Sequence, residues 1–197
     1  MLELEPALSS CVRGGWFARS DGQIDPRRAR EALARALVND GGVLIRGRRV
    51  TGVQSAGGKV SGVVLESGER RAARHVVIAA GARVQGVADL PKRAAFPVKG
   101  EALSIERVEG SPSRVVRTTR AYLCPKSDGR VVIGATEIKD DWSLNPDARR
   151  VGALRAGAMA AFPALDGAPE IERWAGLRPA TSDGAPIIGP APNGPDG

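Results

Sequence analysis

The sequence predicts a mixed α and β fold, in which part of an α/β layer is joined to an antiparallel sheet. Three observations indicate this class. A helix with strong end signals opens the α/β part, short strands with glycine-containing turns follow it, and an apolar strand at 75–81 closes it. After Pro91 the strands follow one another with turns between them. A helix followed by strands is typical of an α/β layer, and strands that follow one another with short turns are typical of an antiparallel sheet.

The first helix is predicted over 25–42. Asp25 is a suitable N-cap, Pro26 suits the first turn, and the apolar residues recur at helical spacing until two glycines end the pattern. Strands are predicted at 43–46, 49–55, 60–66 and 75–81, and the glycines between the middle two suit a hairpin. We expect the last of these strands, HVVIAAG, to be buried.

The second half predicts an antiparallel sheet and one more helix. Strand patterns lie at 101–106, 114–119, 121–125, 130–137 and 170–174, with KSDGR as a hairpin turn at 126–130. A helix is predicted within 145–165, with Asn145 as its cap and Pro146 in its first turn. Its inner face is made of Val151, Leu154, Ala158 and Phe162.

Composition limits the classes of function. The chain has 197 residues, of which 42% are hydrophobic, so it can build a core of one large or two small domains. A formal net charge of +7 permits binding to nucleic acid or anionic lipid. The arginines are scattered, however, and only 4% of residues are aromatic, which leaves few side chains on which the bases of a single strand could stack. We expect no nucleic-acid partner.

The cysteines and the N-terminal residues indicate a reducing compartment. Cys11 and Cys124 form no C-x-x-C motif, so neither a zinc site nor a redox pair is indicated. The first ten residues are acidic where a signal peptide is basic, and no apolar stretch is long enough to cross a bilayer. We therefore expect a cytoplasmic protein with no membrane partner.

Arg178 is the first candidate binding residue. It lies in GLRPAT between Leu177 and Pro179, where a guanidinium in partly dry surroundings could hold a carboxylate through two parallel hydrogen bonds. Such a carboxylate would suit a small substrate such as an amino acid. The alternative is a structural ion pair with an acidic residue such as Asp183. The spacing alone leaves both open.

Two further side chains are candidates, each with a structural alternative. Tyr122 is the single tyrosine and begins a predicted strand, so its hydroxyl could bind the same carboxylate, or its ring could belong to the core. His75 is the single histidine, and we interpret it as a strand-edge residue rather than a general base. The chain therefore offers no Ser-His-Asp arrangement and no metal cluster.

Several ordered motifs resemble the glycine oxidases of the D-amino acid oxidase superfamily of flavoenzymes. They are GQIDPRRAREAL, HVVIAAGA, PVKGEALSI, YLCPKSDGRVVIGATE, DDWSLNPD and WAGLRPATSDGAPIIG, and together they run along nearly the whole chain. The resemblance implies part of a Rossmann-like FAD-binding domain and an antiparallel substrate domain of the D-amino acid oxidase type. We expect ranges of 1–25 and 94–178 for the substrate domain and of 26–93 and 179–197 for the FAD-binding domain.

The resemblance also implies residue roles. Arg178 would pair with the substrate carboxylate, and Tyr122 would donate a hydrogen bond to it. Val50 would contact the adenine end of FAD through its backbone, while Ala80 and Gly81 would lie along the cofactor. The small Ala-Gly end of the strand at 75–81 suits such a close approach, although tight packing would explain it equally. FAD would carry the redox chemistry and the protein would orient the substrate.

The implied reaction is oxidation of glycine or a small amino acid by oxygen, giving an imine that hydrolyses, with a role in thiamine biosynthesis. One departure from the family is clear: no two glycines are separated by a single residue, so no G-x-G-x-x-G is present. We therefore expect the chain to be an internal part of such an enzyme and inactive by itself. Two alternative functions stay open: another amine oxidase or dehydrogenase of the superfamily, acting on sarcosine or a D-amino acid, and a non-catalytic basic binding domain. The protein could also form a homo-oligomer.

Overall fold

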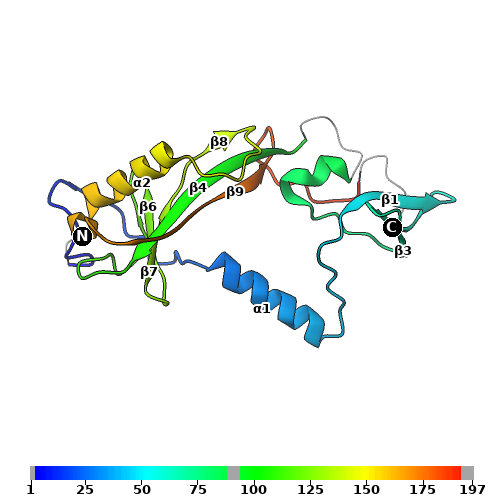
Figure 1. Ribbon diagram of the computed structural model, residues 1–197, viewed down its shortest axis with the longest axis horizontal. Helices are drawn as coiled ribbons and strands as arrows, with labels where there is room; N and C mark the ends of the chain where they lie inside the picture. Colours follow the sequence, from blue (N-terminus) through cyan, green and yellow to red (C-terminus); the bar gives the residue numbers. More distant parts are fainter. Residues whose placement is uncertain (1–2, 88–93, 192–197) are drawn as a thin grey trace. The chain divides into compact units, whose positions relative to one another are not determined.

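The computed structural model describes residues 3–87 and 94–191, and the chain divides into two compact units. Unit one consists of Met1–Leu33 and Lys99–Gly176, and unit two consists of Ala34–Val98 and Leu177–Gly197. Figure 1 labels most of the helices and strands of both units. The four domain ranges inferred from the sequence stay a prediction, because compactness does not show what each range binds.

The described part of the chain consists mainly of short strands, with a few helical segments between them. In chain order they are α1 (Pro26–Asn39), β1 (Val50–Ala56), β2 (Lys59–Leu65), β3 (Arg70–Ala72), η1 (Gly81–Gly86), β4 (Phe96–Glu106), β5 (Val116–Arg117), β6 (Tyr122–Pro125), β7 (Arg130–Gly134), β8 (Ile138–Lys139), α2 (Ala148–Ala161), η2 (Pro163–Leu165) and β9 (Glu170–Ala180). The mixed fold predicted from the sequence is confirmed.

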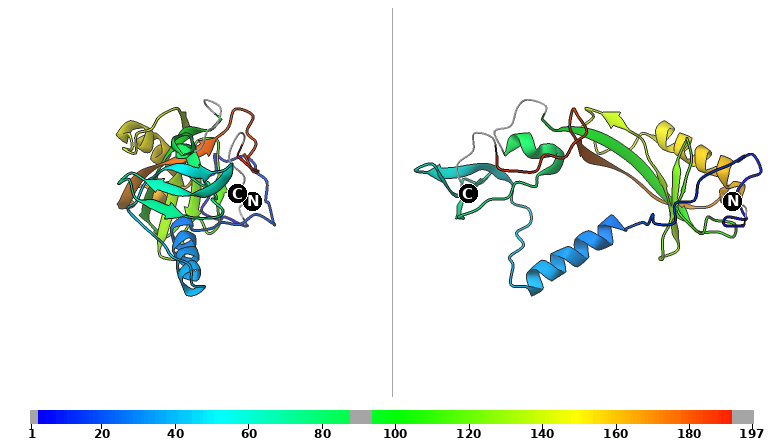
Figure 2. Two further views of the ribbon diagram at one scale, coloured as in Figure 1. Left: turned by 90° about the vertical axis from the view of Figure 1, so that its right-hand side faces the viewer. Right: turned by 180° about the vertical axis from the view of Figure 1, so that it is seen from behind.

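An antiparallel sheet covered by α2 forms the core of unit one. Among the described residues its strand order is β5-β6-β7-β4-β8, and β9 also pairs with β4. Helix α2 runs along one face of this sheet (Figures 1 and 2). The apolar side chains between them include Leu103, Leu123 and Ile133 from the strands and Val151 and Phe162 from the helix segment. Burial of these side chains is the main stabilising contribution to the unit.

Helix α2 confirms the predicted inner face but not the predicted cap. Val151, Leu154, Ala158 and Phe162 are all buried, as their spacing indicates. The cap is Asp147 rather than Asn145, because the Asp147 carboxylate accepts a hydrogen bond of 2.9 Å from the backbone N–H of Arg150. A carboxylate three residues before the bonded N–H is well placed to satisfy one of the unpaired donors of a first helical turn.

The two predicted hairpins are also confirmed. Strands β6 and β7 are antiparallel, with the turn at 126–129 between them. In unit two, β1 and β2 are antiparallel across Gly57 and Gly58, which both have a positive φ. Two residues of positive φ give the turn whose twist matches that of the flanking strands, and glycine adopts that conformation without a steric penalty.

Helix α1 begins where the sequence predicts it and is anchored at its first turn. The Asp25 carboxylate accepts hydrogen bonds from the backbone N–H groups of Arg27 and Arg28 at 3.0 and 3.1 Å. The guanidinium of Arg27 pairs with Glu172 at 2.7 Å and stacks over the ring of Trp174, both on β9. No residue of α1 is buried, so its predicted apolar face is exposed in this structure.

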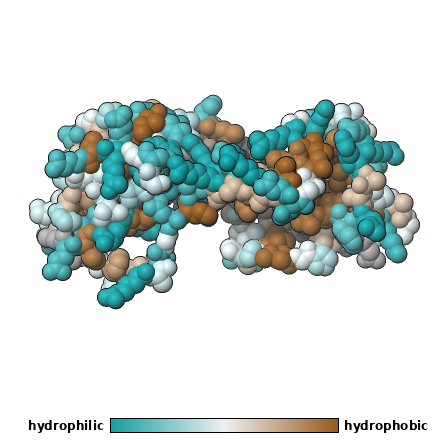
Figure 3. Space-filling model, turned by 90° about the horizontal axis from the view of Figure 1, so that it is seen from below, coloured by the Kyte–Doolittle hydropathy of each residue, from teal (hydrophilic) through white to brown (hydrophobic). Residues whose placement is uncertain are grey.

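Two predicted strands are wrong. Residues 43–46 and 75–80 form no strand, and the side chain of Val77 is 90% exposed rather than buried. The physical reason is that a strand exists only where a neighbour pairs its backbone, and no described strand pairs with either segment. Their apolar side chains, including Val43 and Ile45, are therefore exposed. Figure 3 shows that apolar side chains also gather on the surface of the molecule.

No helix among the described residues is both long and apolar enough to cross a bilayer.

Truncation of the α2 face should destabilise unit one. Leu154 is 5% exposed within the core, so Leu154→Ala should lower the free energy of unfolding by about 2–5 kcal/mol, measured by urea denaturation. Gly152→Ala is the matched control on the same helix, because Gly152 is exposed and a Cβ there meets no atom within 4 Å. That control should raise stability by about 0.5–1 kcal/mol. Equal losses in both variants would contradict the packing described.

Candidate functional site

Tyr122 begins β6, directly after a turn that is closed by a threonine. The backbone N–H groups of Arg120 and Ala121 donate to the Thr118 hydroxyl at 3.1 and 3.0 Å, and this hydroxyl donates to the Ala121 carbonyl at 2.8 Å. The turn therefore fixes where the strand starts. The side chain of Tyr122 is half-buried, which agrees with the polar tip and apolar body of a tyrosine at a strand end.

Strand alternation places Tyr122 on the face of the sheet that is turned away from α2. Its neighbour Leu123 belongs to the core beneath α2, and successive side chains of a strand point to opposite faces. Tyr122 pairs with Gly134 on β7, and Gly134 pairs with Ala102 on β4. The same alternation puts Ser104 on this face; it is fully buried, and its hydroxyl has no hydrogen-bond partner among the described residues.

A buried charge network occupies the other face, at the start of the part of β4 that belongs to unit one. Lys99 is 2% exposed and Glu101 is fully buried. The Lys99 ammonium lies 3.2 Å from a carboxylate oxygen of Glu101 and 3.2 Å from one of Asp141, and it donates to the Asn145 carbonyl at 2.8 Å. Each of these groups is thereby compensated, as buried charges require.

Glu101 also holds the segment that follows β7. Its backbone N–H donates to the Thr136 hydroxyl at 2.8 Å, and the backbone N–H of Thr136 donates to its carbonyl at 3.2 Å. Its carboxylate accepts from the backbone N–H of Asp147 at 3.0 Å and lies 3.5 Å from the Arg150 guanidinium. One carboxyl residue therefore connects β4, the end of β7 and the start of α2.

The pKa shifts in this network follow its geometry. Burial opposes the charge on Lys99, but hydrogen bonds to Asp141 and Glu101 outweigh it and raise the pKa of Lys99. The backbone N–H of Ser143 and then the Lys99 ammonium lower the pKa of Asp141. A lowered carboxyl pKa stabilises the fold above the ordinary value of 3.8, and a raised ammonium pKa stabilises it below 10.5. The contribution of Asp141 to stability is lost as the pH falls through its lowered pKa, and that of Lys99 is lost as the pH rises through its raised pKa.

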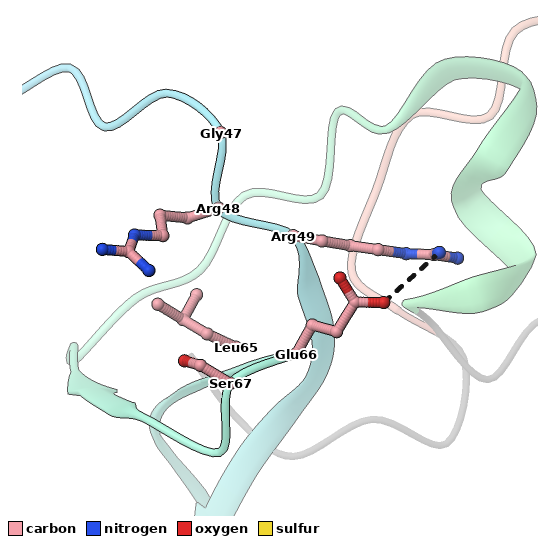
Figure 4. A pocket seen from close by; sticks show the side chains of 6 residues that line it. All are labelled: Gly47, Arg48, Arg49, Leu65, Glu66 and Ser67. Atoms are coloured by element: carbon pink, nitrogen blue, oxygen red, sulfur yellow. Dashed lines mark ion pairs between the residues drawn. The ribbon is translucent and has the colours of Figure 1, made fainter.

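A small pocket adjoins Val50, the first residue of β1. It has a volume of about 280 Å³ and is lined by Gly47, Arg48, Arg49, Leu65, Glu66 and Ser67 (Figure 4). The Arg49 guanidinium lies 3.8 Å from the Glu66 carboxylate, and both side chains are 68% exposed. Val50 pairs with Leu65 on β2, and β1 has no described strand on its other edge. An edge strand has backbone N–H and C=O groups that are not used in strand pairing.

Ala80 and Gly81 lie at the beginning of η1. Both are exposed, and Gly81 has a φ of +58° with no atom within 4 Å of the position that a Cβ would take. The space beside Gly81 is thus open.

His75 lies a few residues before Ala80, is exposed, and is not part of a strand. Among the described residues, no group of three or more His, Cys, Asp or Glu side chains could hold a metal ion.

Arg178 lies near the end of β9, and its side chain is exposed rather than partly buried as the apolar neighbours suggested. Apolar neighbours in the sequence do not cover a side chain on a strand, because they point to the opposite face. The carboxylate of Asp183 accepts a hydrogen bond of 3.0 Å from the backbone N–H of Ala185, and backbone and Thr181 hydrogen bonds lower its pKa. The role of Arg178 stays a prediction.

The structure therefore distributes the predicted site residues over both units. Tyr122 belongs to unit one, and Val50, Ala80, Gly81 and Arg178 belong to unit two. A further cleft in unit one has a volume of about 570 Å³ and none of these residues in its lining, which consists of Arg120, Ala135, Thr136, Arg150, Ala153, Leu154, Ala156 and Gly157.

Sequence reasoning missed the burial of Lys99 and Glu101 and the contact between Gly134 and Tyr122. The first two lie two residues apart, so a strand that began before the predicted 101–106 would place them on one face and could have indicated a charge pair. Their burial could not be read from the sequence. No local signal marks Gly134, because its importance comes from the residue opposite it on the next strand.

Comparisons with known proteins bear on the family and the fold of this chain. The model of the DAO family, described as FAD dependent oxidoreductase, matches residues 1–197. A glycine oxidase of Bacillus licheniformis is 33% identical over 193 residues, which are 96% of this chain and 52% of that protein. A bifunctional ThiO/ThiG protein of Synechocystis is 32% identical over 193 residues, or 95% of this chain and 29% of that protein.

A solved structure shows the same fold. The crystal structure of glycine oxidase from Bacillus cereus superposes with a TM-score of 0.91 at 27% identity, covering all of this chain and 55% of the other. The chain thus spans about half the length, or less, of the relatives named here.

Loss of the buried carboxylate should destabilise unit one strongly. Glu101→Gln leaves the Lys99 ammonium without its fully buried counter-charge, so the free energy of unfolding should fall by about 3–5 kcal/mol in urea denaturation. Glu106→Gln, at the exposed end of the same strand, is the control and should change stability by less than about 0.5 kcal/mol. A similar small effect at both positions would show that the network does not support the fold.

Proposed function

Since this chain belongs to the DAO family of FAD-dependent oxidoreductases, we propose that it takes part in the oxidation of glycine or another small amino acid by oxygen. The products are an imine, which water converts to glyoxylate and ammonia when the substrate is glycine, and hydrogen peroxide. The observation that carries this proposal is the superposition of the whole chain on a glycine oxidase, together with 33% identity to a curated relative of that name.

The site residues are assigned within this proposal. Tyr122 donates a hydrogen bond from its phenol to the substrate carboxylate, and Arg178 holds the same carboxylate through its guanidinium. The half-buried position of Tyr122 at a strand start and the exposed position of Arg178 support these roles, because both side chains are accessible to a ligand. A planar guanidinium matches a carboxylate in shape and charge.

The residues of unit two fit the cofactor. Val50 lies on an edge strand beside two arginines, Arg48 and Arg49, which favour the negatively charged part of a dinucleotide. Ala80 and Gly81 are exposed and small, so the backbone there allows a bulky ligand to approach. We infer that these three backbone positions line FAD, which supplies hydride acceptance and reoxidation by oxygen when it is bound.

The protein contributes orientation and charge. A carboxylate that is held by two hydrogen-bond donors leaves the α-carbon in a defined place, which reduces the entropy that the reaction must otherwise lose. We further propose that the product serves thiamine biosynthesis and that the protein acts in the cytoplasm, as the resemblance to glycine oxidases implies.

The reaction is tested with this chain inside an FAD-loaded polypeptide of the length of its relatives, because the chain by itself is expected to be inactive. We expect glycine to reduce the flavin under anaerobic conditions and to drive oxygen uptake with equimolar peroxide when air is admitted. Sarcosine, a D-amino acid and L-proline serve as competing substrates. Flavin reduction without oxygen uptake would identify a dehydrogenase instead, and salt-dependent binding to RNA without flavin uptake would favour a basic binding domain.

Replacement of the guanidinium should weaken substrate binding. In Arg178→Lys an ammonium cannot reproduce the planar pair of hydrogen bonds, so the KM for glycine should rise about tenfold or more while FAD binding is unchanged. Arg173→Lys on the same strand is the matched control, because Arg173 pairs with Glu170 at 2.6 Å. An unchanged KM in Arg178→Lys would remove Arg178 from the substrate site.

A further inference from the structure

Three residues form one row across the sheet of unit one. Tyr122 on β6 pairs with Gly134 on β7, which pairs with Ala102 on β4. Paired residues point to the same face of a sheet, so a ring, a hydrogen and a methyl group follow one another along this row. The row therefore leaves space above β7, beside the tyrosine ring, where Gly134 has no side chain.

The ring of Tyr122 lies over Gly134 in that space. A Cβ built on Gly134 would be 2.6 Å from both the Cζ and the Oη atom of Tyr122. These two atoms are the far end of the tyrosine side chain. Its phenol end therefore rests on the backbone of Gly134, in a place that any side chain at position 134 would occupy.

The strand beneath the ring is held in place. Ala102 pairs with Gly134, and two residues later the Thr136 hydroxyl and N–H are both bound to the backbone of Glu101. Glu101 is itself fixed by the buried charges around it. Because the backbone on this side cannot retreat, a side chain at position 134 would displace the ring rather than the strand.

We propose that Gly134 is a positioning residue that sets the location of the Tyr122 phenol and thereby the geometry of carboxylate binding. The proposal rests on the proposed function in one respect, that the phenol binds the carboxylate of a small amino acid. A bulkier residue at 134 would lift the phenol from the sheet into the space that the carboxylate takes. Gly134 thus helps to determine which substrates are small enough to bind.

The test uses the fact that the chain has a single tyrosine. Protein labelled with 3-fluorotyrosine gives fluorine NMR signals from Tyr122 alone. Gly134→Ala is compared with Gly152→Ala, whose added methyl group meets no atom within 4 Å. We expect the fluorine resonance to shift in Gly134→Ala and to stay in place in Gly152→Ala. An unchanged resonance in folded Gly134→Ala would overturn the proposal.

Kinetics of the FAD-loaded protein then separate the two parts of the argument. If the phenol binds the carboxylate, Gly134→Ala raises the KM for glycine about tenfold, the effect of losing one hydrogen bond, and changes kcat less. A shifted resonance with an unchanged KM would show that Gly134 positions the ring but that the ring does not bind substrate. That result would overturn the functional role while leaving the oxidase activity itself intact.

A second variant covers a failure of Gly134→Ala to fold. Gly134→Ala combined with Tyr122→Ala removes the ring that the new methyl group contacts. Recovery of the folded state in the double variant, measured by circular dichroism, would support a contact between these two side chains as the cause. If the double variant also fails to fold, the glycine is needed for the backbone alone and the proposal is wrong.

Discussion

The contact between the Tyr122 ring and the bare backbone of Gly134 is the constraint on which the proposed carboxylate site depends. It is not an isolated contact, because the strand under the ring is paired with β4 and tied to Glu101 through Thr136. Glu101 is in turn neutralised by Lys99, inside a network that also reaches the first turn of α2. The position of the Tyr122 phenol therefore depends on charges buried on the opposite face of the same sheet.

This arrangement explains why a buried ion pair is found in so small a unit. Replacing such a pair by apolar residues often costs little stability, so stability alone does not require it. In this chain the Glu101 carboxylate accepts hydrogen bonds from the Thr136 hydroxyl and from the backbone N–H of Asp147, which an apolar side chain could not do. We interpret the network as the device that fixes the end of β7, on which the proposed site is built. The apolar core beneath α2 supplies most of the stabilisation.

Unit two differs in how its apolar residues are used. Its hairpin is well formed, but Val43, Ile45 and Val77 are exposed, and neither segment that carries them is a strand. The pocket beside Val50 is shallow and cationic, and the backbone near Gly81 is open. These features support the inferred cofactor contacts by their accessibility and charge.

The sequence by itself determined what depends on near neighbours: the start of α1 at Asp25, the inner face of α2, both hairpins and the mixed fold class, because caps, periodicity and turns are encoded locally. The ordered motifs also determined the family. Only the tertiary structure decided which apolar segments become strands, since pairing needs a distant partner, and residues 43–46 and 75–80 do not acquire one among the described residues. It likewise decided that Lys99 and Glu101 are buried and that Gly134 meets Tyr122, because burial and cross-strand contact arise between segments that the sequence holds apart.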